Sequence, residues 1–338
     1  TDECLPVALE GARVDLGTPA FTHPTPITNP LHPTSLVQQT IYGGQVEGKP
    51  FRTEVTLLPR TTAVSWRGGT VETALVQYVA YLDGRIHEVA LDRFAQADDG
   101  SVWYFGEDVY HFEDGKVADT NGTWVANDRV PPAMIMPTTP RPGNVYRPEN
   151  APGVVFEEVT VGKVDQEIDG PSGKISGAIE VEELHLDGTR EGKVFAPGYG
   201  EFSTGSPGGD LEAVSLASPT DTRQEPPATG FIALSDAVHG AFDAAAHADV
   251  AGLTRARSTL DAAWDAVAIR AIPPRMAAQM RRDLDARDAA TSKADWPAAQ
   301  SSALRVAQNE LDLRLLYHRM IDVDRSRLAL WARQLPVY

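Results

Sequence analysis

The sequence has one cysteine, Cys4, among its 338 residues. A single cysteine cannot form an internal disulfide or supply the thiolates of a Cys-based zinc site, so we expect Cys4 to be a surface thiol. Long apolar runs are also missing, and without about 18 consecutive apolar residues no membrane-spanning helix is expected. No P-loop, G-x-S-x-G elbow or H-E-x-x-H motif occurs. These absences exclude the usual sequence signatures of nucleotide-binding, serine-hydrolase and zinc-protease sites.

Positive charge is scarce, because 47 acidic residues face 30 basic ones and the formal net charge is −17. Residues 226–338 hold 13 of the acidic and 14 of the basic residues, which leaves a net charge of −18 on the first 225. Nucleic-acid binding needs Lys and Arg to neutralise phosphates, so no nucleic-acid partner is expected. The acidic part is suited to solubility or to attracting cations.

The composition changes along the chain and predicts an α+β protein with four segments. Residues 1–34 are punctuated by proline, which fixes φ and removes backbone donors, and are expected to form an extended arm. Residues 35–217 are predicted to form an acidic antiparallel β-meander that curls into a barrel or bent sheet. A linker is expected over 218–229, and an α-helical bundle over 230–338.

Turn signals and apolar periodicity support this division. Dipeptides that favour tight hairpin turns, Asp-Gly or Asn-Gly, occur at 83–84, 99–100, 114–115, 121–122, 169–170 and 187–188. Strand-like runs lie between them, whereas the Pro-rich stretch 131–153 is predicted to be a loop across one end of the barrel. After the linker, apolar stripes with helical spacing predict five helices, the stripes beginning at Phe231, Leu253, Met276, Leu304 and Leu328.

Several phrases of the β segment appear in a familiar order: "ITNP", "IYGG", "RFAQADDGSVWYFGEDV", "EDGK", "NGTW", "AMIMP", "PGNVYRPEN", "VVFEEV" and "KVFAPGYGEF". Over residues 27–203 the chain resembles a family of uncharacterised exported bacterial β-sheet proteins. The resemblance implies an extracytoplasmic location and a β-meander core, but no reaction. The recurrent carboxylates of the family would correspond to Glu107, Glu158 and Glu183.

The strand "SVWYFGEDVYHF" puts polar groups on a face that also carries aromatic rings. Alternation places Glu107 and His111 on the side of Trp103, Phe105 and Val109. A buried carboxylate needs partners, because burial without them costs several kcal/mol or forces protonation.

Two further strands offer such partners. "VVFEEV" supplies Glu157 or Glu158, and "IEVEELHL" supplies Glu183 and His185, with a predicted β-bulge where its apolar phase shifts. We therefore predict that five residues converge inside the β segment: Glu107, His111, Glu158, Glu183 and His185. Such groups suit a divalent cation or acid–base chemistry. The alternative is a salt-bridge cluster with Arg85, Arg93, Lys193 or Arg190.

A second set of potential ligands lies on the first predicted helix. His239, Asp243 and His247 have i, i+4, i+8 spacing, which aligns them along the helix. About 100° per residue turns this line away from the apolar stripe near Val238, so a core metal site is not expected. The line is predicted to be a solvated face or a surface metal site.

The function predicted from the sequence is extracytoplasmic binding of a small ligand or a divalent metal cation inside the β segment. One alternative is a carboxylate-based hydrolase or lyase, so the sequence leaves open whether the protein is an enzyme. The other is a scaffold that docks a protein partner through its helical bundle. No cofactor is specified beyond the potential divalent metal ion.

Overall fold

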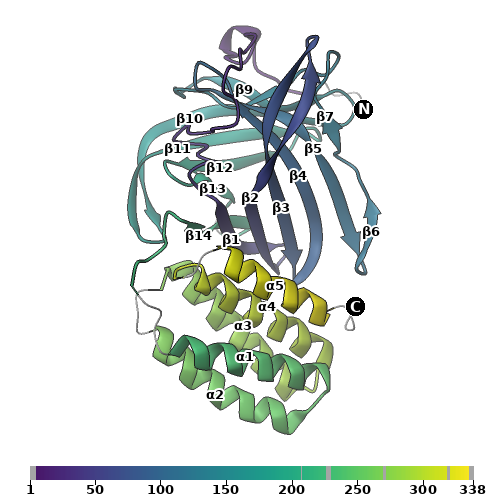
Figure 1. Ribbon diagram of the computed structural model, residues 1–338, viewed down its shortest axis with the longest axis vertical. Coiled ribbons are helices and arrows are strands. Elements are labelled where there is room, and N and C mark those ends of the chain that lie inside the picture. The colour runs from purple at the N-terminus through teal and green to yellow at the C-terminus, as the bar shows by residue number, and fades with distance from the viewer. Residues whose placement is uncertain (1–4, 207, 226–229, 269–271, 318–319, 335–338) are drawn as a thin grey trace.

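The computed structural model describes residues 5–206, 208–225, 230–268, 272–317 and 320–334, and Cys4 therefore lies outside the described residues. One large antiparallel sheet is followed by five helices, which confirms the α+β prediction (Figure 1). None of the described helices is both long and apolar enough to cross a membrane.

The sheet is largely a meander of sequence neighbours, and the exceptions are the pairing of β1 with β14 and of the short strands β7 and β8 with β5. The hydrogen-bonded order is β6-β5-β4-β3-β2-β1-β14-β13-β12-β11-β10-β9, and β7 and β8 pair with β5. The strands are β1 Gln39–Val46, β2 Lys49–Trp66, β3 Gly69–Leu82, β4 Arg85–Gln96, β5 Val102–Glu113, β6 Lys116–Asp119, β7 Trp124–Val125, β8 Ala133–Met136, β9 Val145–Ala151, β10 Val155–Gly170, β11 Gly173–His185, β12 Arg190–Ala196, β13 Gly200–Gly205 and β14 Leu211–Ser218.

The sheet is strongly curved but does not close into a barrel, and the barrel prediction is wrong in this respect (Figure 1). One reason is that the N-terminal arm takes the free edge of β9. The Val14 amide donates to the Val145 carbonyl at 2.9 Å, and Arg13 forms a parallel bridge with Val145. The arm thus satisfies edge groups that a closing strand would otherwise pair.

The Pro-rich stretch 131–153 is not the loop that its composition predicts, because it contains β8 and β9. Proline is tolerated in β9 because that strand lies at the end of the sheet, where Pro148 need not donate to a further ladder. The turn expected at 169–170 also differs: Gly170 is the last residue of β10, and residues 171–172 form the turn.

The arm is irregular apart from a 3-10 turn at Glu10–Ala12, and part of it is built into the β core. Ile27 is fully buried, and the buried Asn29 amide donates to the carbonyls of Gly100 and Pro137 at 3.0 and 3.2 Å. These contacts fix the arm across one end of the curved sheet.

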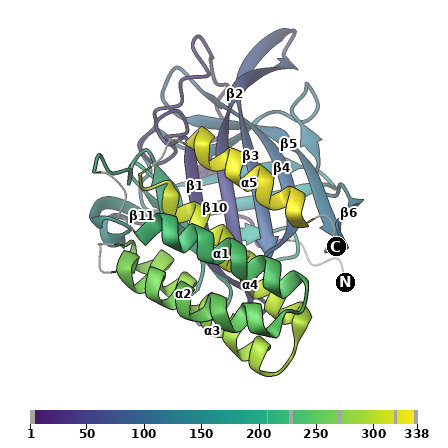
Figure 2. The same ribbon diagram turned by 60° about the horizontal axis from the view of Figure 1, so that its bottom comes forward.

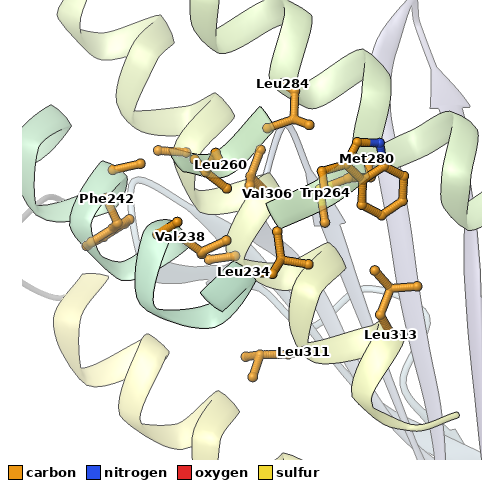
Figure 3. Close-up of a cluster of buried hydrophobic side chains, with 14 of the residues drawn as sticks. Leu234, Val238, Phe242, Leu260, Trp264, Met280, Leu284, Val306, Leu311 and Leu313 are labelled. Carbon is orange, nitrogen blue, oxygen red and sulfur yellow. The ribbon is translucent and has the colours of Figure 1, made fainter. Parts of the chain in front are cut away.

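The helices are α1 Gly230–Ala246, α2 Val250–Ala268, α3 Pro274–Ser292, α4 Trp296–Arg314 and α5 Met320–Gln334. Their apolar stripes meet in one core, of which Figure 3 shows Leu234, Phe242, Leu260 and Trp264. The same core includes Ile41 of β1 and Leu216 of β14, so the helical region packs against the sheet.

Charged side chains extend this contact. Arg52 of β2 pairs with Asp312 of α4, and Arg327 of α5 contacts both Asp312 at 2.7 Å and Glu54 at 3.4 Å. Figure 2 shows α5 crossing the strands β1–β3. The helices therefore cover the outer face of the sheet at these strands. The inner face is covered by side chains of the β region itself.

Candidate binding site on the inner face of the sheet

The strand register places most of the predicted site residues on the inner face of the sheet. Glu107 lies opposite Asp92, and His111 lies opposite Glu88. Directly opposed residues of antiparallel strands share a face. The carboxylates that this rule places on the inner face are Glu88, Asp92, Glu107, Glu149, Glu157, Glu183, Glu191, Glu201 and Glu212.

Glu158 lies on the opposite face, and its neighbour Glu157 occupies the inner one. The Glu158 carboxylate accepts hydrogen bonds from the Arg147 guanidinium at 3.0 Å and from the Ala8 amide at 2.6 Å. It therefore anchors the N-terminal arm to the outer face. Glu157 instead lies opposite His185, so the inner cluster contains this residue in place of Glu158.

Glu107 forms a carboxyl pair with Glu149, and both side chains are partly exposed on the inner face. Burial, followed by the nearby charges of Asp92 and Glu149, raises the pKa of Glu107 to about 10. Burial and the charge of Glu157 raise the pKa of Glu149 to about 7. The pair holds a proton at neutral pH, because two close carboxylates cannot both ionise without repulsion.

His111 belongs to a separate group at the far end of β5. Its Nδ1 lies 2.8 Å from an Asp119 carboxylate oxygen, and its Nε2 lies 3.6 Å from Glu88. The imidazole is 34% exposed, as expected for a partly solvated ion-pair partner. The structure thus does not bring His111 into the group that contains His185.

Glu183 and His185 form a cluster with Glu157 and Lys193. Among the described residues, Glu157, Glu183 and His185 are the three potential metal ligands whose donor atoms lie within 4.8 Å of one another. The Lys193 ammonium, however, already lies 2.7 Å from Glu183 and 3.6 Å from Glu201. A cation of the chain itself therefore neutralises these carboxylates.

The protonation states agree with an ion-pair network. Hydrogen bonds with Glu157 and Glu191 raise the pKa of His185 to about 10, so the imidazole is charged at neutral pH and has no free lone pair for a metal. Burial lowers the pKa of Lys193, but the carboxylates of Glu201, Glu183 and Glu157 outweigh it and hold this pKa well above its ordinary value. The geometry thus favours the salt-bridge alternative for this cluster, with Lys193 as the main partner.

The predicted β-bulge between Val181 and Leu184 is absent. The ladder of β11 with β12 runs without a shift from Ile179 to Leu184. Leu184 is buried on the outer face, whereas Val181 is buried on the inner face with Glu183 and His185. The phase shift in the sequence reflects a strand that is buried on both faces.

A cavity of about 190 Å³ lies on the inner face between the arm and strands from both halves of the sheet. The arm contributes His32, Pro33 and Thr34 to its wall, and Val37 joins them from the segment just before β1. Its aromatic rings come from Tyr42, Tyr78, Phe94, Phe195 and Tyr199, and its carboxyl groups from Asp92, Glu201 and Glu212. A concave space that combines rings with a few polar groups is typical of small-molecule sites.

Two of the cavity carboxyl groups have no ion-pair partner among the described residues. Asp92 accepts a hydrogen bond from the Tyr104 hydroxyl at 2.8 Å, and Glu212 is paired with no Lys, Arg or His. Burial raises the pKa of both carboxyls to about 7. Burial also lowers the pKa of His32 to about 4, so this imidazole is neutral at physiological pH.

The sequence offered a weak signal for these residues. Asp92 alternates with Ala90 and Phe94 in β4, as Glu107 alternates with Val109 in β5, and this alternation places Asp92 on the inner face. Glu201 and Glu212 lie in short strands with little alternation, and His32 lies in the irregular arm. Their convergence depends on the curvature of the sheet.

A larger cavity of about 680 Å³ lies between the arm and β8 and β9. Its charged groups largely neutralise one another: Arg13 pairs with Asp15 at 2.6 Å, and Arg147 pairs with Glu158 at 2.9 Å. The smaller cavity is the better candidate, because Asp92 and Glu212 lack a counter-ion there.

The histidines of α1 lie away from the inner face. His239, Asp243 and His247 are exposed on the helix, whereas Leu234 and Val238 are buried in the bundle core. The Nδ1 atoms of the two histidines lie 2.7 and 2.8 Å from the carbonyl oxygens of Ser235 and Asp243. The set therefore lies on the exposed face that the helical geometry predicts.

No family model, no curated protein and no solved structure matches the chain. The functional interpretation consequently rests on the geometry of the cavity and of the carboxyl groups around it.

Proposed function

We propose that the β region is a binding protein for a small organic ligand, which it holds in the 190 Å³ cavity on the inner face of the sheet. An extracytoplasmic location, expected from the resemblance to exported proteins, is part of this proposal. The cavity has about the volume that six molecules of liquid water occupy, so it suits a compact ligand. Binding needs no catalytic step, and none is included.

The observation that carries the proposal is the composition of the cavity wall. Rings such as Tyr42 and Phe94 supply apolar contact, whereas Asp92 and Glu212 supply polar groups that no cation of the described chain neutralises. Burying a carboxylate without a paired cation costs free energy. Carboxyl groups with strongly shifted pKa values in a cavity are common at functional sites.

The test is a thermal-shift and calorimetric screen of compact cationic, neutral and anionic molecules against the full chain. Val76 lines the cavity from β3, and Val76→Phe should fill it and weaken binding of any hit at least tenfold. Leu186→Phe is the matched control, because Leu186 is 51% exposed and does not line the cavity. A hit that binds Val76→Phe as tightly as wild type contradicts the proposal, as does a screen without a hit in any charge class.

A further inference from the structure

Two of the tyrosine hydroxyls at the cavity wall form hydrogen bonds with other groups of the chain. The Tyr42 hydroxyl donates to the Glu201 carbonyl at 2.9 Å, and the Tyr199 hydroxyl donates to Asp221 at 2.8 Å. Phe94 and Phe195 have no polar group to offer. A ligand in the cavity therefore meets ring surfaces on several sides and few hydrogen-bond donors.

The charge in the cavity has one sign. Asp92 and Glu212 are unpaired among the described residues, and Lys193, which lies near Glu201, is already engaged by Glu183. His32 is neutral and adds no competing positive charge. Ring faces carry the negative end of the aromatic quadrupole, so rings and carboxylates favour the same kind of ligand.

We propose that the ligand of this cavity is a compact organic cation with an alkylated ammonium head group. The proposal rests on the binding function proposed above and specifies its ligand class. An alkylated ammonium offers methyl groups to the rings and a diffuse positive charge to the carboxylates, and it needs few hydrogen bonds. Tyr42, Phe94 and Phe195 supply the apolar contacts, and Asp92 and Glu212 supply the counter-charges.

A bare metal ion fits this cavity less well. Divalent ions need several oxygen or nitrogen ligands at about 2.0–2.6 Å. Among the described residues, the cavity carboxylates Asp92, Glu201 and Glu212 do not form a group close enough to share one ion. A wall that carries both carboxylates and aromatic rings better matches a cation of organic size.

Affinity for such a cation should rise with pH. Asp92 and Glu212 are partly protonated near pH 7, and a bound cation favours their charged forms, so binding releases protons. The charged or titratable groups that interact electrostatically with these two carboxyls are Tyr42 of β1, Tyr78 of β3, Glu88 and Arg93 of β4, Tyr104 and Glu107 of β5, Lys193 of β12 and Glu201 of β13. We expect affinity to increase several-fold from pH 6 to pH 8 as these two carboxyls ionise. His32 does not contribute to this change, because its pKa of about 4 leaves it neutral over the whole range.

The deciding experiment compares choline with 3,3-dimethyl-1-butanol, its neutral isostere, by calorimetric titration of the full chain at pH 8. We expect choline to bind at least tenfold more tightly, and tetramethylammonium to compete with it. Equal affinities, a preference for the isostere, or no choline binding would overturn the ammonium proposal. Neutral or anionic hits that Val76→Phe excludes would still support the binding function.

Single substitutions test which carboxylates bind the cation. Glu212→Gln should lower choline affinity at least fivefold and leave binding of the isostere unchanged, and Asp92→Asn should act in the same direction. Glu182→Gln is the matched control, because Glu182 lies on the outer face and pairs with Arg190. Folding of each variant is checked by its melting temperature. Choline affinity that is unchanged in a folded Glu212→Gln protein contradicts the proposed role of this carboxylate.

Discussion

At the scale of single residues, the carboxyl pair of Glu107 and Glu149 links protonation to stability. The folded protein keeps the Glu107 proton up to about pH 10, whereas an unfolded chain loses it near pH 4.5. A pKa raised in the folded state contributes stability that is present below the unfolded pKa and is lost as pH rises through the folded one. The pair should therefore make the protein sensitive to alkaline pH.

Glu107→Gln tests this expectation. The amide keeps a hydrogen bond to Glu149 without a proton that can be lost, so the free energy of unfolding should fall less between pH 7 and pH 10. We expect the difference from wild type to reach on the order of 1 kcal/mol at pH 9. Urea unfolding at a series of pH values measures it, with the exposed Glu182→Gln as control. Parallel pH profiles for wild type and Glu107→Gln would refute the assignment.

Lys193 is the second residue whose role can be isolated, because its ammonium neutralises Glu183 and Glu201. Lys193→Gln removes that cation and leaves a group of buried negative charges. We expect the variant to gain a saturable site for Ca²⁺ or Zn²⁺ and to depend on it for stability, whereas the wild-type cluster takes up neither ion. Calorimetric titration with each ion, after chelator treatment, decides the matter. Saturable binding of either ion at this cluster in wild type would show that Lys193 does not replace a metal.

At the scale of elements, the N-terminal arm acts as a built-in part of the β core. It takes the edge of β9 through Val14, closes one end of the sheet and lines the cavity through His32. An arm expected from its prolines to be merely extended thus supplies both structure and part of the candidate site.

Asn29 anchors that arm, because its buried side chain bonds Gly100 and Pro137 and accepts from the Leu31 amide. Asn29→Ala should cost about 1–3 kcal/mol, since it removes the donor of the buried Pro137 carbonyl and of the partly buried Gly100 carbonyl. Urea unfolding gives the cost, and hydrogen exchange over residues 24–37 should accelerate. Asn121→Ala, in an exposed turn, should change neither quantity appreciably. An unchanged exchange rate in the arm of Asn29→Ala would contradict the anchoring role.

At the scale of the whole molecule, buried charges join the helices to the sheet. Asp312 of α4 pairs with Arg52 of β2 and with Arg327 of α5, and its side chain is 3% exposed. Attraction from both guanidinium groups holds the pKa of Asp312 below its ordinary value, against the opposing effect of burial. This network lies beside the apolar contact of Ile41 and Leu216 with the bundle.

Asp312→Ala should cost about 3–5 kcal/mol, because it leaves two buried guanidinium groups with Glu54 as their remaining shared partner. Asp261→Ala, on the exposed face of α2, is the control. Proteolytic cleavage within residues 219–228 tests the predicted linker between the β region and the helices. The fragments should stay associated in wild type and separate more readily in Asp312→Ala, as gel filtration would show. If the cleaved fragments of the wild-type protein separate freely, this interface does not hold the helices to the sheet.

Features that depend on local geometry could be predicted from the sequence. Helical spacing gave the five C-terminal helices, because a period of 3.6 residues fixes which side chains share a face. Alternation with Val109 gave the inward direction of Glu107, since successive side chains point to opposite faces. The prediction that Trp103 and Phe105 share this face is wrong, because β5 has one extra residue between Tyr104 and Glu107 in its register against β4.

Features that depend on which distant segments pair could not be predicted from the sequence. Sequence could not choose between Glu157 and Glu158, because the choice depends on the register of β10 against β11. It also could not show that the arm would take the edge of β9 and that the sheet would stay open. Edge groups pair with whichever segment the whole fold brings to them, and curvature then brings Asp92 and Glu212 from separate strands to one cavity.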